Sequence, residues 1–293
     1  MGFTTQSTPN IDKMKYFLIF AILVSPVFSQ WTLLHKKIPL VEDDVIRLNV
    51  VAGQSNAVGS SADWSAFTLP ASASNIRFEL SSVSNGAGGG NPTSYPSLDF
   101  QPLVNFTNRW LGPEAGFSDA LISAFPDRDL AVFKSSIGGT SLFIHWDHNP
   151  PAPLELTRNT VEGLAAYKTS LENSTGKTVV LESVFWWQGE SDANNDRAFI
   201  WEDKMVETIQ FWRDTLGAPN LKFYLGRLPD YQSAIYVNHQ FMRDAVENIA
   251  ANDPNAEWID LDGLNSNDTV HVDQAGQIIV GQRWFAQYRV DFP

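Results

Sequence analysis

The chain has 293 residues, of which 43% are hydrophobic and 18% are charged, and it contains no cysteine. This composition excludes a disordered chain and is typical of a folded protein with a sizeable core, while the missing cysteines exclude disulfides, zinc–thiolate sites and cysteine nucleophiles. The formal net charge of −13 argues against nucleic acid as the main partner, because a phosphate backbone is bound by clustered lysine and arginine.

The amino-terminal segment has the pattern of a secretory signal. Residues 16–28 form an uncharged apolar run that follows Lys13 and Lys15. The run is too short to span a bilayer as a helix, and compact side chains precede Gln30 as they do at a cleavage site. A membrane anchor and a buried amino-terminal helix are the alternatives. We expect a signal peptide over residues 1–29, and therefore a secreted, extracellular protein with no stable membrane anchor.

A linker is predicted over residues 30–44, and a single domain over residues 45–293. Within this domain, short apolar runs that end at glycine, proline or a polar turn predict buried strands. The predicted strands are residues 45–52, 130–137, 178–187, 221–228 and 257–261. Segments of helical period are found at about residues 113–125, 159–171, 198–216, 234–251 and 273–288.

The alternation of strands and helices predicts the fold class. Strands that are separated by helices form a parallel sheet, because each right-handed crossover places a helix on one of its faces. We therefore expect an α/β domain with a five-stranded parallel sheet covered on both sides. Residues 60–109 are rich in Ser, Gly, Pro and Asn, and we predict a long loop insertion there.

Two polar motifs follow the first and the last predicted strand, at the edge of the sheet where open α/β sheets bind ligands. Ser55 lies in the turn after the first strand, and a serine hydroxyl becomes a nucleophile when a base takes its proton. His271 follows the last strand as a candidate base, with Asp268 three residues before it to orient the ring. The alternatives are that each of Ser55 and Asp268 caps a helix.

Acyl transfer also needs hydrogen-bond donors for the negative charge that develops on the ester oxygen. The pair Gly138 and Gly139 after the second strand offers backbone N–H groups, and Gln188 after the third offers an amide. The glycines could instead form a plain turn. The neighbouring Trp186 and Trp187 are candidates for core packing.

Five motifs carry a resemblance when they are taken together. They are GQSNA at 53–57, GPE at 112–114, GGTS at 138–141, WWQGESD at 186–192 and DTVH at 268–271. In this order they resemble the SGNH-type esterases, and more narrowly the sialate O-acetylesterase-like branch with plant carbohydrate esterases and microbial acetyl xylan esterases. The resemblance spans about residues 45–290. It implies a flavodoxin-like, three-layer α/β/α sandwich.

The resemblance also implies roles for single residues. Ser55 is then the nucleophile, with His271 and Asp268 completing the triad, and the oxyanion hole consists of the Ser55 N–H, Gly139 and Gln188. For Glu190 we expect a supporting role, in which it orients loops through hydrogen bonds. Ala57 stands where many members of the branch have Met, a change that concerns the shape of the pocket. No cofactor and no metal are expected.

The predicted function is a secreted serine esterase that removes acetyl groups from carbohydrates through an acyl-enzyme. An acetylated carbohydrate is thus the expected partner, and a neutral glycan such as xylan is preferred because no arginine is marked as a carboxylate clamp. Trp146 and Trp187 are candidates for stacking on sugar rings.

Other functions stay open on the sequence alone. A two-carboxylate glycosidase would use Glu190 with Asp192 or Asp262. A glycan-binding protein without catalysis would use the same fold. The segment His-Trp-Asp-His at 145–148 could bind a metal, although a hydrated loop is the preferred interpretation.

Overall fold

The computed structural model describes residues 44–60, 62, 76–84, 101–102, 111–149 and 155–293. The chain divides into the units Met1–Val41 and Glu42–Pro293, and every described residue belongs to the second unit. The predicted signal peptide and nearly all of the predicted linker therefore lie outside the described residues. Within the described ranges, no helix combines the length and the apolarity needed to cross a membrane.

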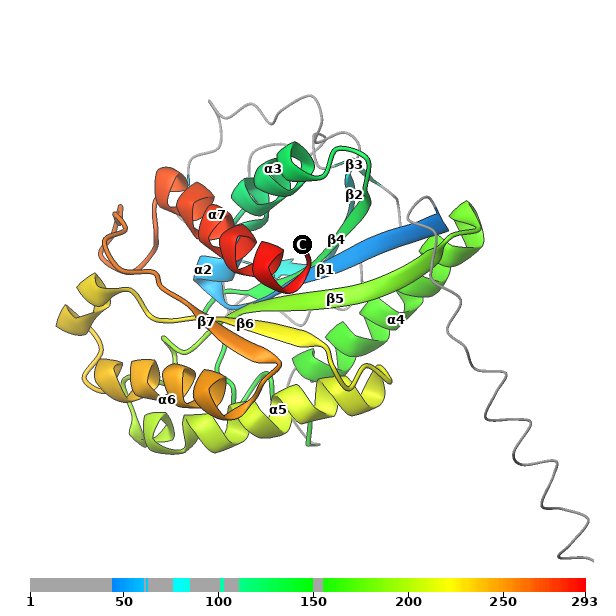
Figure 1. The fold of residues 1–293 in the computed structure, drawn as a ribbon. Helices are drawn as coiled ribbons and strands as arrows, with labels where there is room; N and C mark the ends of the chain where they lie inside the picture. Colours follow the sequence, from blue (N-terminus) through cyan, green and yellow to red (C-terminus); the bar gives the residue numbers. More distant parts are fainter. Residues whose placement is uncertain (1–43, 61, 63–75, 85–100, 103–110, 150–154) are drawn as a thin grey trace, which may run out of the picture. The chain divides into compact units, whose positions relative to one another are not determined.

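One open sheet forms the centre of the second unit, with the strand order β3-β2-β4-β1-β5-β6-β7 (Figure 1). The strands are β1 (Val45–Gly53), β2 (Ile76–Ser84), β3 (Gln101–Pro102), β4 (Asp129–Ile137), β5 (Thr178–Trp187), β6 (Lys222–Gly226) and β7 (Ala256–Ile259). The short strand β3 is antiparallel to β2, and all other neighbours in the sheet are parallel.

Helices cover both faces of this sheet (Figure 1). They are α2 (Ser55–Val58), α3 (Glu114–Ala124), α4 (Leu156–Thr175), α5 (Trp201–Thr215), α6 (His239–Asn252) and α7 (Gln274–Asp291), with the 3-10 turns η4 (Asp196–Ile200) and η5 (Asp230–Ala234). Helices α3 and α7 lie on one face, and α4, α5 and α6 lie on the other.

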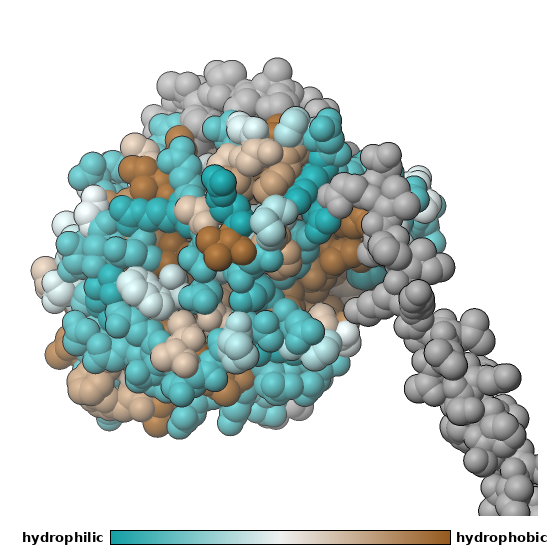
Figure 2. All heavy atoms as spheres, viewed as in Figure 1, coloured by the Kyte–Doolittle hydropathy of each residue, from teal (hydrophilic) through white to brown (hydrophobic). Residues whose placement is uncertain are grey.

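Each face of the sheet has its own hydrophobic core. In β1, Leu48 and Val50 belong to the core under α4, α5 and α6, whereas Val51 belongs to the core under α3 and α7. This alternation follows from the strand geometry, because successive side chains point to opposite faces. On the face seen in Figure 2, hydrophilic residues predominate among the described residues, with scattered apolar residues between them. The predicted three-layer α/β/α architecture is confirmed.

The predicted number of strands is too low. All five predicted strands are present, but β2 and β3 also form within the segment that was expected to be a loop insertion. The sequence of β2, IRFELSSVS, has no continuous apolar run, and therefore a buried strand was not predicted there. The segment forms a strand because it pairs with β4 from Ile76 to Ser84. Such pairing can decide the structure where the local sequence preference is weak.

Strand order reverses at β1, whose neighbours are β4 and β5. Open α/β sheets bind ligands at such a point, outside the carboxyl ends of the strands. There the backbone N–H of Gln54 donates to Trp187 O at 2.9 Å, and a Cβ added to Gly53 would lie 2.0 Å from the same oxygen. Gly53 has a φ of +140°, which glycine adopts readily and residues with a Cβ rarely do. Glycine at this position therefore allows β1 and β5 to end in close contact.

Candidate active site

Ser55 is the first residue of α2, immediately beyond the carboxyl end of β1. The turn is tight, since Val58 N donates to Gln54 O at 2.9 Å and Ser60 N donates to Ser55 O at 3.0 Å. Ser55 as a whole is only 7% exposed. The sequence therefore places this hydroxyl-bearing residue where strand order reverses, in a nearly buried turn.

His271 and Asp268 are held together in the loop between β7 and α7. The Nδ1 of His271 lies 2.7 Å from Asp268 Oδ2, and the other carboxylate oxygen accepts from the backbone N–H groups of His271 at 2.7 Å and Val270 at 3.0 Å. Thr269 between them has a φ of +68°, a left-handed conformation that closes the loop. One carboxylate thus fixes both the ring, through Nδ1, and the backbone of the same residue.

The side chain of Asn56 joins the serine turn to the histidine loop. Its Oδ1 accepts from Val272 N at 2.9 Å, and its Nδ2 donates to Val270 O at 3.2 Å, so that it bonds both chain neighbours of His271. The backbone oxygen of Asn56 also accepts from Gln277 Nε2 of α7 at 3.0 Å. We call this set of contacts the Asn56 clasp. It brings Ser55 and His271 to the same edge of the sheet, each one residue away from a clasp contact.

Glu190 lies behind the clasp. Its Oε1 accepts from Asn56 Nδ2 at 2.7 Å, and the residue is only 2% exposed. Burial raises the pKa of this carboxyl group, while the hydrogen bond from Asn56 acts in the opposite direction. Its Oε2 is buried and has no hydrogen-bond partner among the described residues. Glu190 thus supports Asn56, and it lies near enough to His271 to interact with it electrostatically.

Asp192 joins the loops that follow β4 and β5. This fully buried carboxylate accepts from Ser141 Oγ at 2.5 Å and Leu142 N at 2.9 Å on one side, and from Gln188 Nε2 at 2.8 Å on the other. Gln188 Nε2 also lies 3.1 Å from Thr140 O and 3.2 Å from Gln54 Oε1. A substrate oxygen would therefore compete with three protein acceptors for the two N–H groups of Gln188. Gly139 is exposed in the same loop as Ser141, with a φ of +71°.

The candidate sugar-stacking tryptophans were predicted wrongly. Trp146 and Trp187 are both 0% exposed, and Trp146 packs edge-on against Trp186 with ring centroids 4.9 Å apart. Large apolar rings next to a sheet bury more surface in the core than at a cleft, and the sequence alone does not distinguish the two positions.

The segment 145–148 has ordinary structural contacts. Asp147 pairs with Lys204 Nζ at 2.8 Å, His148 stacks on Phe211 with centroids 4.7 Å apart, and His145 Nδ1 accepts from Ser141 N at 3.0 Å. Across the described ranges, no group of three or more histidine and carboxylate side chains is arranged to hold a metal ion.

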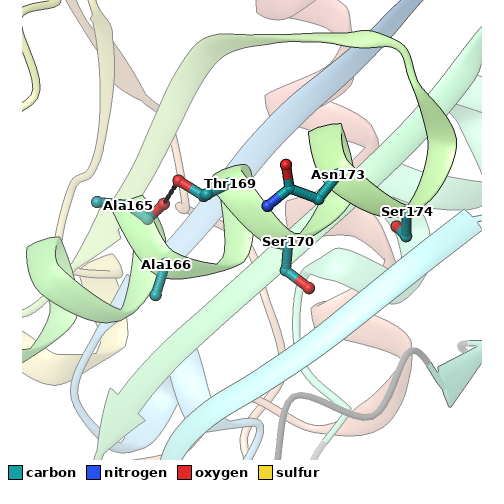
Figure 3. A pocket seen from close by; sticks show the side chains of 6 residues that line it. All are labelled: Ala165, Ala166, Thr169, Ser170, Asn173 and Ser174. Carbon is teal, nitrogen blue, oxygen red and sulfur yellow. Dashed lines mark hydrogen bonds between the residues drawn. The ribbon is translucent and has the colours of Figure 1, made fainter.

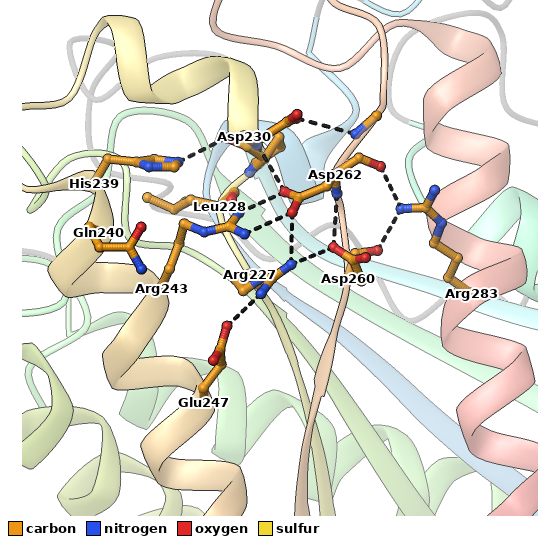
Figure 4. Close-up of polar contacts among 12 residues, drawn as sticks. Arg227, Leu228, Asp230, His239, Gln240, Arg243, Glu247, Asp260, Asp262 and Arg283 are labelled. Atoms are coloured by element: carbon orange, nitrogen blue, oxygen red, sulfur yellow. Dashed lines mark hydrogen bonds and ion pairs between the residues drawn. The ribbon is translucent and has the colours of Figure 1, made fainter.

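Two carboxylates of the glycosidase alternative, Asp262 and Asp192, are hydrogen-bonded to other protein groups. Asp262 accepts two hydrogen bonds from Arg243, at 2.7 and 2.8 Å, and a third from Arg227 at 2.8 Å (Figure 4). The hydrogen bonds from Arg243 lower the pKa of Asp262, so this carboxyl group is unsuited to act as a general acid. The network ties the carboxyl ends of β6 and β7 to α6, and Asp192 is committed to the loop contacts described above.

A separate surface hollow lies along α4 and is lined by Ala165, Ala166, Thr169, Ser170, Asn173 and Ser174 (Figure 3). These side chains are small and uncharged, and none of them is a base or a metal ligand. The hollow therefore offers no catalytic group, and the chemistry is concentrated at the carboxyl ends of β1, β4, β5 and β7.

The motifs also contain Asn56, to which no role was assigned, and Asp192, which was considered only as a glycosidase carboxylate and not as a link between loops. Each lies within five residues of the end of a predicted strand, and each is a polar residue in a segment expected to face the crevice. That position is the signal that could have identified them, because a buried polar side chain must find partners in a neighbouring loop.

Comparisons with known proteins identify the family of this chain. The family model for "Carbohydrate esterase, sialic acid-specific acetylesterase" matches residues 45–290. A comparison with curated proteins finds no match.

Several solved structures share the fold. A protein from Arabidopsis thaliana has a TM-score of 0.62 and 18% identity, over 84% of this chain and 99% of that chain. NanS has a TM-score of 0.60 and 14% identity, over 86% and 99%. A carbohydrate acetylesterase from Xanthomonas citri has a TM-score of 0.55 and 15% identity, over 83% of this chain and 55% of that chain. At these identities the structures show the fold alone.

The family match covers nearly the whole described domain and confirms the resemblance found in the five motifs. The chain belongs to the carbohydrate esterase, sialic acid-specific acetylesterase family, and it is a carboxylic ester hydrolase of the carbohydrate O-acetylesterase class.

Proposed function

We propose that this enzyme cleaves O-acetyl esters of carbohydrates with Ser55 as the nucleophile, His271 as the base and Asp268 as the residue that orients the base. The single observation that carries the proposal is the Asn56 clasp, which bonds to Val270 and Val272 from the residue next to Ser55. A serine and a histidine held at one sheet edge, with a carboxylate 2.7 Å from the far ring nitrogen, are the parts that acyl transfer requires.

The reaction has two halves. In the first, His271 Nε2 takes the proton of Ser55 Oγ, and this oxygen attacks the acetyl carbonyl carbon to give a tetrahedral oxyanion. The sugar oxygen then leaves with the proton from His271, and an acetyl ester remains on Ser55. In the second half, a water molecule gives a proton to His271 and attacks this ester, and acetate is released as the proton returns to Ser55.

Donors for the oxyanion lie around Ser55 in this proposal. They are the backbone N–H groups of Ser55 and Gly139 and the amide of Gln188. In support, Gln188 and the loop of Gly139 are both anchored on buried Asp192, so that the two donors keep a fixed relation to each other. Donors that are fixed before the reaction stabilise the developing charge with little reorganisation, and Gln188 would exchange one of its three protein acceptors for the oxyanion.

A neutral acetylated glycan is the preferred substrate class. The arginines Arg227 and Arg243 are engaged by protein carboxylates, and the net charge of −13 disfavours an anionic sugar. An acetylated sialic acid is the second candidate, because the partly exposed Arg197 lies 3.5 Å from Ser141 Oγ in the crevice loop. It also lies 3.9 Å from the carboxylate of Asp192, which occupies part of its charge.

The decisive experiment is acetate release from a panel of acetylated xylan, acetylated neutral oligosaccharides and O-acetylated sialic acid, with Ser55→Ala beside the wild type. We expect the wild type to release acetate from the neutral glycans and Ser55→Ala to release none. Release of reducing sugar would support the glycosidase instead, and binding without any acetate would support a glycan-binding protein. Preference for the sialic acid ester, lost in Arg197→Ala, would establish the second candidate.

We also propose that the enzyme is secreted. The support is the apolar run at residues 16–28 behind Lys13 and Lys15. Expression of the full chain in a eukaryotic secretory host, followed by amino-terminal sequencing of the protein in the medium, is expected to give a start at Gln30. A protein retained in the membrane pellet with residues 16–28 intact would refute the signal.

A further inference from the structure

A buried ion pair contacts the end of the serine turn. Lys134 of β4 approaches Glu114 at the start of α3, with Nζ 2.6 Å from Oε1, and both side chains are fully buried. Lys134 stands opposite Val51 in the register of β4 and β1, close to the end of β1. The reaction described above does not use either residue.

The pair holds two backbone segments together. Lys134 Nζ also donates to the carbonyl oxygen of Val58 at 3.1 Å, and Val58 is the last residue of α2. Glu114 Oε1 accepts from the backbone N–H of Gly112 at 2.9 Å. One end of the pair therefore fixes the helix that begins with Ser55, and the other fixes the chain next to that helix.

The two backbone segments are in close contact. A Cβ added to Gly112 would lie 2.7 Å from Ala57 O and 3.1 Å from Lys134 Nζ, and one added to Gly59 would lie 1.8 Å from Leu111 O. Side chains larger than hydrogen would therefore separate α2 from residues 111–112. The position of α2 depends on this packing and on the ion pair beneath it.

A helix of four residues cannot hold its own position. It has a single turn, and no side chain caps its amino end. A first turn is unfavourable in isolation because it fixes several dihedral angles for one hydrogen bond. The Asn56 clasp fixes this turn near its beginning, and Lys134 fixes it at its end through Val58. Ser55 is thereby held from both sides.

We infer that Lys134 and Glu114 are positioning residues for Ser55, which deepens the proposed function and rests on it. A buried ion pair is a poor device for stability, because apolar residues of similar volume usually stabilise a fold as well or better. The pair here supplies what apolar residues cannot, a donor for Val58 O and an acceptor for Gly112 N. Its contribution is therefore the placement of the nucleophile.

The experiment compares two double variants of the same chemical kind. Lys134→Met with Glu114→Gln removes the charges and the donor to Val58 O. The control, Arg47→Met with Glu182→Gln, neutralises another ion pair, which joins β1 to β5. Its Glu182 also accepts from Tyr288 Oη. Each protein is measured for its melting temperature, for kcat and KM on p-nitrophenyl acetate, and for the rate at which a fluorophosphonate labels Ser55.

In the Lys134 and Glu114 variant, we expect kcat and the labelling rate to fall by about 10-fold or more, with KM within about twofold, because a small displacement of a nucleophile is costly. The control variant is expected to keep the kcat and labelling rate of the wild type. If the double variant does not fold, Glu114→Gln alone takes its place, and it is expected to lower kcat by about threefold because Lys134 loses its counter-ion.

The outcomes separate this inference from the proposed function. A wild-type protein that hydrolyses the ester and is labelled, together with an equally active folded variant at positions 134 and 114, overturns the positioning role alone. An equal fall of kcat in the control variant also overturns it, because any loss of buried charge would then have the same effect. A wild-type protein with neither hydrolysis nor labelling overturns both proposals.

Discussion

The Asn56 clasp gives the sharpest prediction for stability and activity together. Asn56→Ala removes three hydrogen bonds, to Glu190 Oε1 at 2.7 Å, to Val270 O at 3.2 Å and from Val272 N at 2.9 Å. The buried Glu190 carboxylate then loses its donor, at a cost of about 2–3 kcal/mol, and the buried N–H of Val272 loses its acceptor, at a cost of about 1–2 kcal/mol. We expect the free energy of unfolding to fall by about 3–5 kcal/mol.

Thermal unfolding followed by circular dichroism tests this value. For a domain of this size, about 3–5 kcal/mol corresponds to a melting temperature lower by about 6–20 °C. The same variant is expected to lose about 100-fold in kcat on p-nitrophenyl acetate, measured well below its melting temperature, because the loop of His271 is no longer tied to the turn of Ser55.

Asn248→Ala is the matched control. Asn248 is exposed on α6, and its Nδ2 donates to Glu202 Oε2 at 3.0 Å. Loss of this surface contact is expected to change the free energy of unfolding by no more than about 0.5 kcal/mol and to leave kcat unchanged. The reasoning is refuted if Asn56→Ala behaves like this control, with an unaltered melting temperature and an unaltered kcat.

Four further expectations follow from the site. Ser55→Ala is expected to lower kcat on p-nitrophenyl acetate by about 10³-fold or more, and turnover equal to the wild type would remove the acyl-enzyme. Asp268→Asn is expected to lower kcat by about 10²-fold, which is less than the loss in Ser55→Ala, because asparagine keeps the size of the side chain but only one of its two acceptor oxygens. A loss below twofold would contradict the orienting role. The pKa of Glu190 is raised in the folded state, so the folded protein keeps this proton to a higher pH than the unfolded chain does. Stability therefore falls as the pH rises from the ordinary glutamate pKa to the raised one. Glu190→Gln is expected to flatten this dependence in melting temperatures measured across pH, and an unchanged dependence would assign it to another group. Incubation with EDTA is expected to leave the rate of acetate release unchanged, and a loss restored by a divalent cation would oppose the serine mechanism.

The layers of the fold could be predicted because burial on both faces leaves a clear trace in the sequence. Strands β1, β4 and β5 each contain an apolar run and are buried along most of their length, as is typical of strands covered by helices on each side. Strand β2 leaves no such trace, and it forms through its pairing with β4. Pairing between segments far apart in the chain is not visible in either segment alone.

The candidate site divides in the same way. Residues with unusual chemistry after a strand end, such as Ser55 and His271, could be selected from the motifs. Contacts that depend on the fold could not, because nothing local shows that Asn56 would bond to residues more than 200 positions away or that Lys134 would be buried against Glu114. Trp146 shows the opposite case, in which a residue type suited to sugar binding is used in the core.

The separation of the two halves of the clasp along the chain has a consequence for biosynthesis. Asn56 and Val272 are 216 positions apart, so Ser55, the proposed nucleophile, leaves the ribosome long before His271, its proposed base. A growing polypeptide carries the serine without the histidine, and contacts of such long range form late in folding. In the proposed mechanism, hydrolytic activity therefore arises only after the loop of His271 has joined the turn of Ser55, and a product truncated before His271 is expected to be inactive.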